Sequence, residues 1–576
     1  MINFRPKDVV SWTNLISSLA RRGSSSEMAL FEATSMRNSG IEPNSYTLVC
    51  LIKASTNLGW IFYGQQLHSY ILQSGFDSNI FVSSSLISFY MKCQLFNDAH
   101  KVFVDIPQSN VVSWNSLISG YLQCGKFHKA LSLVPELDRS DLQADSFTFT
   151  AAIAACAKLC FLNLGKSIHS KIVKFGLESC FVVGNCLIDM YGKCGSVEES
   201  IRVFHEMINK DVISWNSVIE ASARNGELKA ALSFLHRMPF PDAISYNEVI
   251  NGIAQFGNME DAVRILMETP NPNSSSWNSI IAGYVNKDRA REALDFFSKM
   301  HSKDIKMDQF TFSSILSGVA FISALTWGTL IHCCTIKFGL DTPIVVGSAL
   351  IDMYSNCGQV NMAESIFCSL PRKNLVTWNT MISGYAHNGN AREVIRLFEE
   401  LKMVQDLEPD AITFLSVLSS CWQNGELMHL GIQYFELMVN YYGIFPTPEH
   451  CSCMIHLMGQ RGEIRKAERM IHEMGFGSCG LVWRALLGAC GVCGDLRVAE
   501  VAAAKVIELE GNNEFVYVLL SNISASHGRW GDVSEIRELM REKGLRKEAG
   551  CSWIEVENVV STSAIGADLT LKSNII

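Results

Sequence analysis

The sequence has little proline and no excess of basic residues. It contains 13 Pro among 576 residues, too few for a collagen-like or low-complexity chain. Lys and Arg number 48 against 57 Asp and Glu, which gives a formal net charge of −9. This balance argues against a protein that holds nucleic acid through a broad basic surface, so any such contact has to be local. Hydrophobic residues make up 48% of the chain, ample material for a packed core.

Signatures of several other protein classes are also missing. The 19 Cys are odd in number and lie largely in apolar segments, which favours a reducing compartment over a disulfide framework. Residues 1–8 resemble neither a signal peptide nor an Arg- and Ser-rich transit peptide. Residues 309–336 carry no charge, but their pattern matches 146–173, which holds three Lys. We therefore expect two amphipathic helices there and no membrane span.

A short string centred on tryptophan recurs along the chain. Trp114 and Trp215 are 101 residues apart (215 − 114), and so are Trp277 and Trp378 (378 − 277). Each interval divides into units of 35, 35 and 31 residues. The division predicts fourteen units without linkers, at 9–44, 45–79, 80–110, 111–145, 146–180, 181–211, 212–242, 243–273, 274–308, 309–343, 344–374, 375–410, 411–447 and 448–479.

Each unit has the pattern of two helices. In the unit 111–145, Trp114, Leu117, Ile118 and Tyr121 fall at i, i+3, i+4 and i+7, which is one apolar helix face. A break at Gly125 precedes a second helical pattern. One such hairpin cannot cover its own apolar face, so neighbours have to stack. We predict an all-α solenoid over 9–479 after a short lead at 1–8, then a helical extension over 480–557 and an irregular tail over 558–576.

The unit openings resemble those of pentatricopeptide repeat proteins. The segments that carry the likeness are Val-Ser-Trp-Asn-Ser-Leu-Ile-Ser-Gly-Tyr (112–121) and Leu-Ile-Asp-Met-Tyr-Gly-Lys-Cys-Gly (187–195). Alternation of 35-, 35- and 31-residue units resembles the plant PLS subclass. Residues 482–490, 517–523 and 550–556 resemble its E-type C-terminal extension, which ends in a short strand-like piece. The resemblance implies organellar RNA binding, most often to specify sites of cytidine-to-uridine editing.

Some members of that family carry a cytidine deaminase, which needs His-x-Glu and Pro-Cys-x-x-Cys to hold zinc. Neither string occurs in the sequence. We therefore expect a non-enzyme with no cofactor and no metal, whose deaminase is supplied in trans by a relative with editing accessory proteins. Cys490 and Cys493, and a cluster of His450, Cys451, Cys453 and His456, are interpreted as packing residues.

Asn115 follows Trp114 by one residue, about 100° around the helix, so it should lie beside the buried face. Asp145, the last residue of the same unit, should lie alongside it. Two such polar side chains suffice to discriminate the Watson–Crick edge of an unpaired base. The alternative interpretation is that the Asn after Trp merely caps or bridges neighbouring helix turns.

The two-residue code of the family assigns bases to nine of these pairs. Asn with Asp implies uridine, at Asn115/Asp145, Asn185/Asp211, Asn216/Asp242, Asn278/Asp308 and Asn379/Asp410. Ser or Thr with Asn implies adenine, at Thr13/Asn44, Ser84/Asn110 and Ser348/Asn374, while Asn247/Asn273 implies a pyrimidine, with cytidine favoured. The other five units do not match the code. The implied target reads A, any, A, U, any, U, U, C or U, U, any, A, U, any, any.

The leading hypothesis is a single-stranded RNA-binding adaptor that presents a cytidine to a deaminase in a mitochondrion, with the chloroplast as the alternative. Two other functions stay open: an RNA splicing, stability or translation factor, and a helical protein-interaction scaffold with no RNA role. The acidic total is compatible with RNA binding if basic residues gather along one groove and acidic residues on the opposite side.

Overall fold

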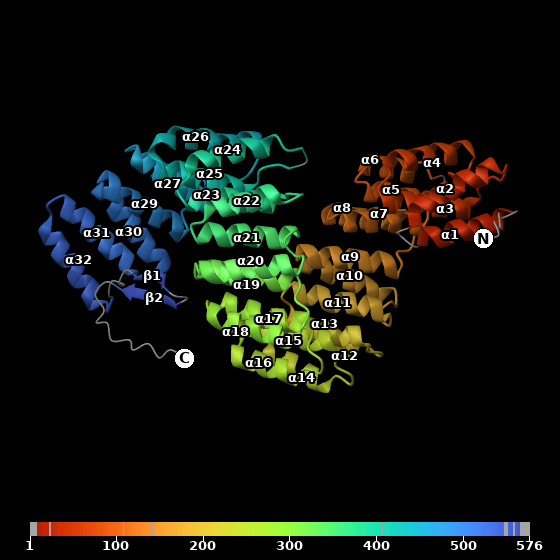
Figure 1. Ribbon diagram of the computed structural model, residues 1–576, viewed down its shortest axis with the longest axis horizontal. Coiled ribbons are helices and arrows are strands. Elements are labelled where there is room, and N and C mark those ends of the chain that lie inside the picture. Colours follow the sequence, from red (N-terminus) through yellow and green to blue (C-terminus); the bar gives the residue numbers. More distant parts are fainter. Residues whose placement is uncertain are drawn as a thin grey trace. The chain divides into compact units, whose positions relative to one another are not determined.

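The computed structural model describes residues 8–21, 25–106, 109–140, 142–405 and 407–545, together with two strands at 551–556 and 559–564. The chain divides into two bodies, Met1–Pro272 and Asn273–Ile576. Each is a run of helical hairpins (Figure 1), as the repeat pattern predicts.

The N-terminal body contains helices α1 to α16. They are α1 (Val9–Arg21), α2 (Ser26–Asn38), α3 (Ser45–Leu58), α4 (Ile61–Gln73), α5 (Ile80–Lys92), α6 (Phe96–Val104), α7 (Val111–Gln123), α8 (Phe127–Arg139), α9 (Ser146–Leu159), α10 (Leu162–Lys174), α11 (Phe181–Lys193), α12 (Val197–Glu206), α13 (Val212–Arg224), α14 (Leu228–Arg237), α15 (Ala243–Phe256) and α16 (Met259–Glu268).

The C-terminal body continues the series to α32. Its helices are α17 (Ser274–Asn286), α18 (Ala290–Ser302), α19 (Gln309–Phe321), α20 (Leu325–Lys337), α21 (Ile344–Asn356), α22 (Val360–Ser369), α23 (Leu375–His387), α24 (Ala391–Lys402), α25 (Ala411–Gln423), α26 (Met428–Glu436), α27 (Pro448–Gln460), α28 (Ile464–Glu473), α29 (Gly480–Cys493), α30 (Leu496–Glu510), α31 (Glu514–Ser526) and α32 (Trp530–Glu542). Short turns at Gly425–Leu427 and Leu437–Tyr441 flank α26.

The odd-numbered helices from α1 to α27 begin at the first residue of the fourteen predicted units. We call these the first helices and their even-numbered partners the second helices. The hairpin turn in the unit 111–145 contains Gly125, whose φ of 72° is accessible to glycine at little cost. Helices of this length are marginal alone, so packing between units has to stabilise them.

An aromatic contact between neighbouring units recurs in the core. The ring of Phe103 in α6 meets Trp114 in α7 edge to face, with 4.7 Å between the ring centroids. The equivalent pairs Phe204–Trp215 and Phe367–Trp378 lie 4.8 and 4.9 Å apart. Such pairs contribute about 0.5–1.5 kcal/mol beyond the apolar area they bury. The recurring tryptophan therefore joins each of these second helices to the first helix that follows it.

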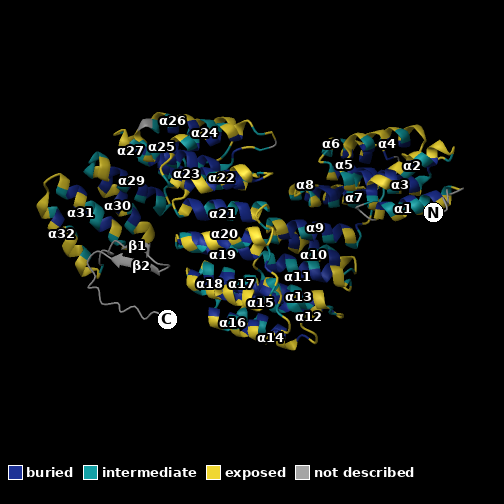
Figure 2. Cartoon of the chain, viewed as in Figure 1, coloured by how far each residue is buried: buried dark blue, intermediate teal, exposed yellow. Residues whose placement is uncertain are grey.

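The hairpins are arranged in two layers within each body. First helices of successive units pack against one another, as α5 does on α7 and α11 on α13, and second helices pack on the first helices of their own and the following unit. Buried residues line the contact between the layers (Figure 2). The apolar face predicted for 111–145 is part of this core, because Leu117 and Ile118 are fully buried.

The C-terminal end differs from the predicted irregular tail. Strand β1 (Cys551–Val556) pairs antiparallel with β2 (Val559–Ala564), and Val556 lies opposite Val559. The strand-like character predicted at 550–556 thus extends into a two-stranded hairpin. The β-branched residues Val559, Val560 and Thr562 explain the error, since they favour a strand once a partner strand lies beside them. Residues 565–576 fall outside the described part. In the part of the chain that is described, every helix is too short or too polar to cross a bilayer.

Candidate functional site

The second member of each predicted pair caps the first helix of the next unit. In all nine, the side-chain oxygen accepts a hydrogen bond from a backbone N–H in the first turn of that helix; the nine residues are Asn44, Asn110, Asp145, Asp211, Asp242, Asn273, Asp308, Asn374 and Asp410. Capping of this kind is worth about 1 kcal/mol. Helix capping is therefore the structural role of the second residue of the pair, whereas the alternative interpretation assigns it to the Asn that follows Trp.

The first member of each Asn/Asp pair does not cap a helix but donates to the capping carboxylate. Asn Nδ2 lies 2.9 Å from Asp Oδ1 in Asn115/Asp145, 3.3 Å in Asn185/Asp211 and Asn216/Asp242, 3.0 Å in Asn278/Asp308 and 2.9 Å in Asn379/Asp410. Residues about 30 positions apart are thus held in contact at the junction of two units. We call each such set of two side chains a polar pair.

The cap leaves one atom of its side chain uncommitted. Asp145 Oδ1 accepts the backbone N–H of Thr148 and the Asn115 amide at 2.9 Å each, and the Thr148 hydroxyl oxygen lies 3.0 Å from the same atom. Asp308 and Asp410 likewise receive these bonds on Oδ1. Asp and Asn cap equally well, and they differ in the remaining atom, an acceptor Oδ2 in Asp and a donor Nδ2 in Asn.

The three Ser or Thr pairs use the same junction. The Thr13 hydroxyl lies 2.8 Å from the Thr47 hydroxyl, and that of Ser348 lies 3.1 Å from Thr377. Ser84 is buried, and its Oγ has no hydrogen-bond partner in the described residues. The two members of the ninth pair, Asn247 and Asn273, belong to different bodies; Asn273 caps α17.

Polar pairs open into grooves on the surface of the first helices. In the C-terminal body, Ser348, Asn374, Asn379 and Asp410 line a single groove of about 650 Å³. All of its lining residues come from α19, α21, α23 and α25 or their caps. Two successive pairs therefore line one space, although Asn379 itself is only 7% exposed.

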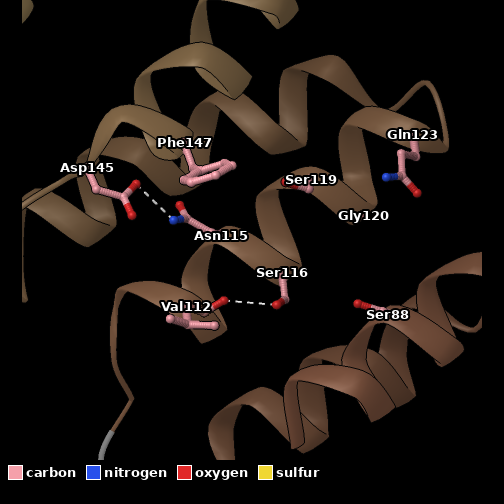
Figure 3. Close-up of a pocket in the computed structure, with 9 residues that line it drawn as sticks. All are labelled: Ser88, Val112, Asn115, Ser116, Ser119, Gly120, Gln123, Asp145 and Phe147. Carbon is pink, nitrogen blue, oxygen red and sulfur yellow. Dashed lines mark hydrogen bonds between the residues drawn. The ribbon is translucent and has the colours of Figure 1, made fainter. Parts of the chain in front are cut away.

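A second groove, of about 430 Å³, contains Asn115 and Asp145 in the N-terminal body. Figure 3 shows their two side chains pointing toward one another, with the Phe147 ring beside them. Ser119 and Gln123 line the same groove from α7, and Ser88 lines it from α5.

A row of exposed apolar side chains accompanies the pairs, and the sequence analysis missed it. The second residue of twelve units is a large apolar side chain that is between 44% and 76% exposed: Val10, Tyr46, Phe81, Val112, Phe147, Val182, Ile213, Ile244, Phe310, Val345, Val376 and Ile412. The units 274–308 and 448–479 have Ser275 and Glu449 instead. The sequence signal that could have indicated this row is a large apolar residue at the second position of nearly every unit.

Basic residues on the groove face are confined to the N-terminal body. The thirteenth residue of five of its units is Lys or Arg: Arg21, Lys92, Lys158, Lys193 and Arg224. The same place holds Asn286, Phe321, Asn356, His387 and Gln423 in the C-terminal body. Two of the five cations are paired on their own helix, Lys193 with Asp189 at 2.7 Å and Arg224 with Glu220 at 2.6 Å. Three of the five cations, Arg21, Lys92 and Lys158, therefore have no ion pair within the described residues of this body.

The pKa values of carboxyl groups near the unit junctions are shifted in different directions. Desolvation raises the pKa of Asp211, but the hydrogen bonds from Ser214 and Asn185 outweigh it and leave the pKa below its ordinary value. The same balance, with Ser245 and Asn216, lowers the pKa of Asp242. Both are ionised at neutral pH. Glu248 differs, because burial, and then the charge of Glu220, raise its pKa to about 6.

The Cys and His cluster near residue 450 is packed into the fold. His450 Nδ1 accepts from the hydroxyl or the backbone N–H of Thr447, and its Nε2 lies 2.8 Å from the Ala411 carbonyl oxygen. Cys451 and Cys453 are buried, and burial raises the pKa of each thiol to about 12. Within the described residues, no three His, Cys, Asp or Glu side chains are grouped so that they could hold a metal ion.

Family models match much of the chain. The model described as PPR repeat family matches residues 109–158, 272–320 and 373–423. The model described as PPR repeat matches 185–212, 213–239, 244–269, 348–375 and 449–476. The E motif matches residues 494–555.

Relatives and solved structures agree with these matches. A putative pentatricopeptide repeat-containing protein of Arabidopsis thaliana is 51% identical, over 95% of each chain. Two further Arabidopsis proteins of this name, one called mitochondrial and one chloroplastic, are 33% and 32% identical over 97% and 96% of this chain, which spans 76% and 56% of them. The crystal structure of maize PPR10 has a TM-score of 0.55 and 18% identity, covering 93% of this chain and 79% of PPR10. The chain belongs to the plant pentatricopeptide repeat family, in the PLS arrangement with an E motif.

Proposed function

We propose that this protein binds single-stranded RNA with one base per unit and selects a site for organellar cytidine-to-uridine editing. The observation that carries the proposal is the polar pair. Five Asn/Asp pairs make the same hydrogen bond at five of the unit junctions. Helix capping accounts for the Asp but not for an Asn that donates to it. A repeated donor and acceptor at a groove is the arrangement that reading one base per repeat requires.

The atoms left over at an Asn/Asp pair complement uracil. Asn115 retains one N–H, since the other donates to Asp145, and Asp145 retains Oδ2 as an acceptor. Uracil offers O4 to accept and N3–H to donate, which matches this order. Cytosine offers an acceptor at N3 and a donor at N4, so both contacts would be repulsive. The uridine assignment of the five pairs therefore has a direct chemical basis.

The exposed apolar row supplies the second requirement. Val112 and Phe147 lie in the same groove on either side of the pair Asn115/Asp145. An unstacked base loses its stacking contacts with the neighbouring bases. Apolar side chains on both sides of the base replace these contacts, and stacking on an aromatic ring contributes about 1–3 kcal/mol to binding. This contact is independent of base identity and compensates for the few free cations.

The comparisons support RNA as the ligand and an organelle as the compartment. Maize PPR10, whose fold the chain shares, has been solved in complex with an 18-nt psaJ RNA element. Relatives carry the words mitochondrial and chloroplastic in their names. We favour the mitochondrion. The E motif at 494–555 is proposed to recruit a deaminase-bearing relative in trans, with accessory proteins.

Two measurements test the proposal. Purified protein should bind a 14-nucleotide RNA with A at positions 1, 3 and 11 and U at 4, 6, 7, 9 and 12, and should bind poorly when these A and U are interchanged. Equal affinity for both RNAs contradicts base reading. Sequencing of organellar transcripts from plants without the protein should show one or a few cytidines that are no longer edited. Intact editing together with altered splicing or transcript abundance contradicts the editing role and favours the other RNA functions.

A further inference from the structure

The third residue of each following unit carries a hydroxyl that reaches back to the polar pair. In four Asn/Asp pairs this hydroxyl donates to the Asn carbonyl oxygen: Thr148 to Asn115, Ser245 to Asn216 and Thr311 to Asn278 at 2.7 Å each, and Thr413 to Asn379 at 2.6 Å. These are short, well-formed bonds. The amide of each Asn is thus held at both ends, by the hydroxyl at Oδ1 and by the carboxylate at Nδ2.

The fifth Asn/Asp pair lacks this bond. Ser214, the equivalent third residue, donates to Asp211 Oδ1 at 2.8 Å. Asn185 is 9% exposed, and its Oδ1 is buried without a hydrogen-bond partner in the described residues. The Asn185 amide is also more loosely held at its other end, 3.3 Å from Asp211. An unsatisfied buried carbonyl costs free energy. Among the described residues, the weak contact with Asp211 is the hydrogen bond that favours one orientation of this amide.

We propose that the hydroxyl of the third residue is a positioning group for base recognition, and that it divides the polar pairs into locked and unlocked ones. The inference rests on the proposed function, because it concerns how well each pair discriminates bases. In a locked pair the remaining Asn N–H has a fixed direction into the groove. In the unlocked pair Asn185/Asp211 the amide turns more freely, so a base that needs an acceptor there is tolerated better.

The Ser and Thr pairs divide in the same way. The Thr47 and Thr377 hydroxyls contact Thr13 and Ser348. Ser113 instead donates its hydroxyl to the backbone carbonyl oxygen of Asn110, and the Ser84 hydroxyl is left without a partner among the described residues. Both unlocked pairs belong to 31-residue units of the N-terminal body, at 80–110 and 181–211.

The chain contains a matched comparison for this role. Ser214 and Ser245 are both fully buried third residues. In each, the backbone N–H donates to the capping Asp, the hydroxyl oxygen accepts the Asp N–H, and the hydroxyl lies 2.8 Å from Oδ1 of the same Asp. Ser245 differs in two contacts, because its hydroxyl also lies 2.7 Å from Asn216 Oδ1 and 3.3 Å from Met238 Sδ. S214A and S245A therefore remove the same capping box at neighbouring junctions, and S245A alone removes a contact to the Asn.

The experiment measures the affinity ratio of U over C at the sixth and seventh bases of the 14-nucleotide RNA, for wild type, S214A and S245A. Wild type should show the larger ratio at the seventh base. S245A should lower that ratio between about two- and tenfold, the range of one hydrogen bond, and leave the sixth unchanged. S214A should change neither ratio. S245T, which keeps the hydroxyl, should behave as wild type.

Two results overturn the positioning role: an unchanged seventh-base ratio in S245A, or an equal loss at the sixth base in S214A. T413V repeats the test at the twelfth base in the other body and replaces S245A if that variant fails to fold. A wild-type protein that binds this RNA without preferring U at either base overturns the base reading itself and this inference with it. Failure of the base reading can thus be told apart from failure of the positioning role, because the wild-type protein alone reveals it.

Discussion

Replacing Asp145 by Asn separates the capping role of this residue from its proposed reading role. In D145N the amide oxygen would still accept from the N–H of Thr148 and from the Asn115 amide, which lie 2.9 Å from Oδ1 of Asp145 in the present structure. Asn and Asp rank equally as caps. The cost to folding is then the loss of one negative charge at the N-terminus of α9, about 0.3–1 kcal/mol. The thermal midpoint should fall by no more than about 3 °C.

The effect on RNA binding should be much larger. The substitution turns the free acceptor Oδ2 into a donor, which faces N3–H of uracil. A hydrogen bond to a charged group is worth about 1.5–3 kcal/mol, so affinity for RNA with U at the fourth base should drop about 10- to 100-fold. RNA with C at that base should bind better than to wild type, because its N3 accepts. Fluorescence anisotropy with the two RNAs measures both changes.

D495N provides the control for this experiment. Asp495 caps α30 by accepting the Val498 N–H at 3.2 Å, outside the fourteen units. It should reproduce the small change in thermal midpoint and leave affinity for both RNAs unchanged. If D145N folds and still prefers U at the fourth base to the same degree as wild type, Oδ2 does not contact the base and the reasoning from the cap is wrong.

Three further outcomes follow from the groove. F147A should weaken binding about fivefold or more, the cost of one lost stacking contact, while base preference is retained; Phe147 is 74% exposed, so a large loss of thermal stability would contradict this. A plot of log affinity against log salt should have a slope near −2, about 0.7 for each of the cations Arg21, Lys92 and Lys158, and a slope steeper than about −6 would contradict the sparse phosphate contacts. The pKa of Glu248 is raised to about 6 from an ordinary 4.5, so ionisation of this group destabilises the fold as pH rises from about 4.5 through 6. In urea unfolding, E248Q should therefore raise the free energy of unfolding by about 1 kcal/mol at pH 7, allowing for solvent screening, and should not change it below about pH 4.5. An equal gain at both pH values would exclude titration of Glu248 as the cause.

Five of the unit boundaries are marked twice in the sequence, and the regular spacing between them predicts the others. Trp114 and its equivalents fix the apolar face, and the polar residue three or four positions earlier, such as Asn110, is a helix-capping residue. Those two signals locate a helix start without any knowledge of its neighbours. The C-terminal hairpin lacked such marks, because the β-branched residues of β2 favour a strand only when a partner strand lies beside them.

The contacts of the pairs could be predicted less completely. Proximity of Asn115 and Asp145 follows from spacing alone, but the direction of the hydrogen bond and the role of Thr148 do not. A Ser or Thr at the third residue looks the same in sequence whether its hydroxyl meets Asn216, as Ser245 does, or Asp211, as Ser214 does. The packing of neighbouring units decides between them, and the sequence of one unit does not specify it.

The double role of the capping residue, in helix stability and in the proposed base contact, has a consequence for how such proteins diverge. Asp and Asn cap the next helix through the same side-chain oxygen, so exchanging one for the other at a unit junction should alter the recognised base with little loss of folding stability. After gene duplication, a copy could therefore acquire a new transcript by single-nucleotide mutations, one unit at a time, without passing through an unstable ancestor.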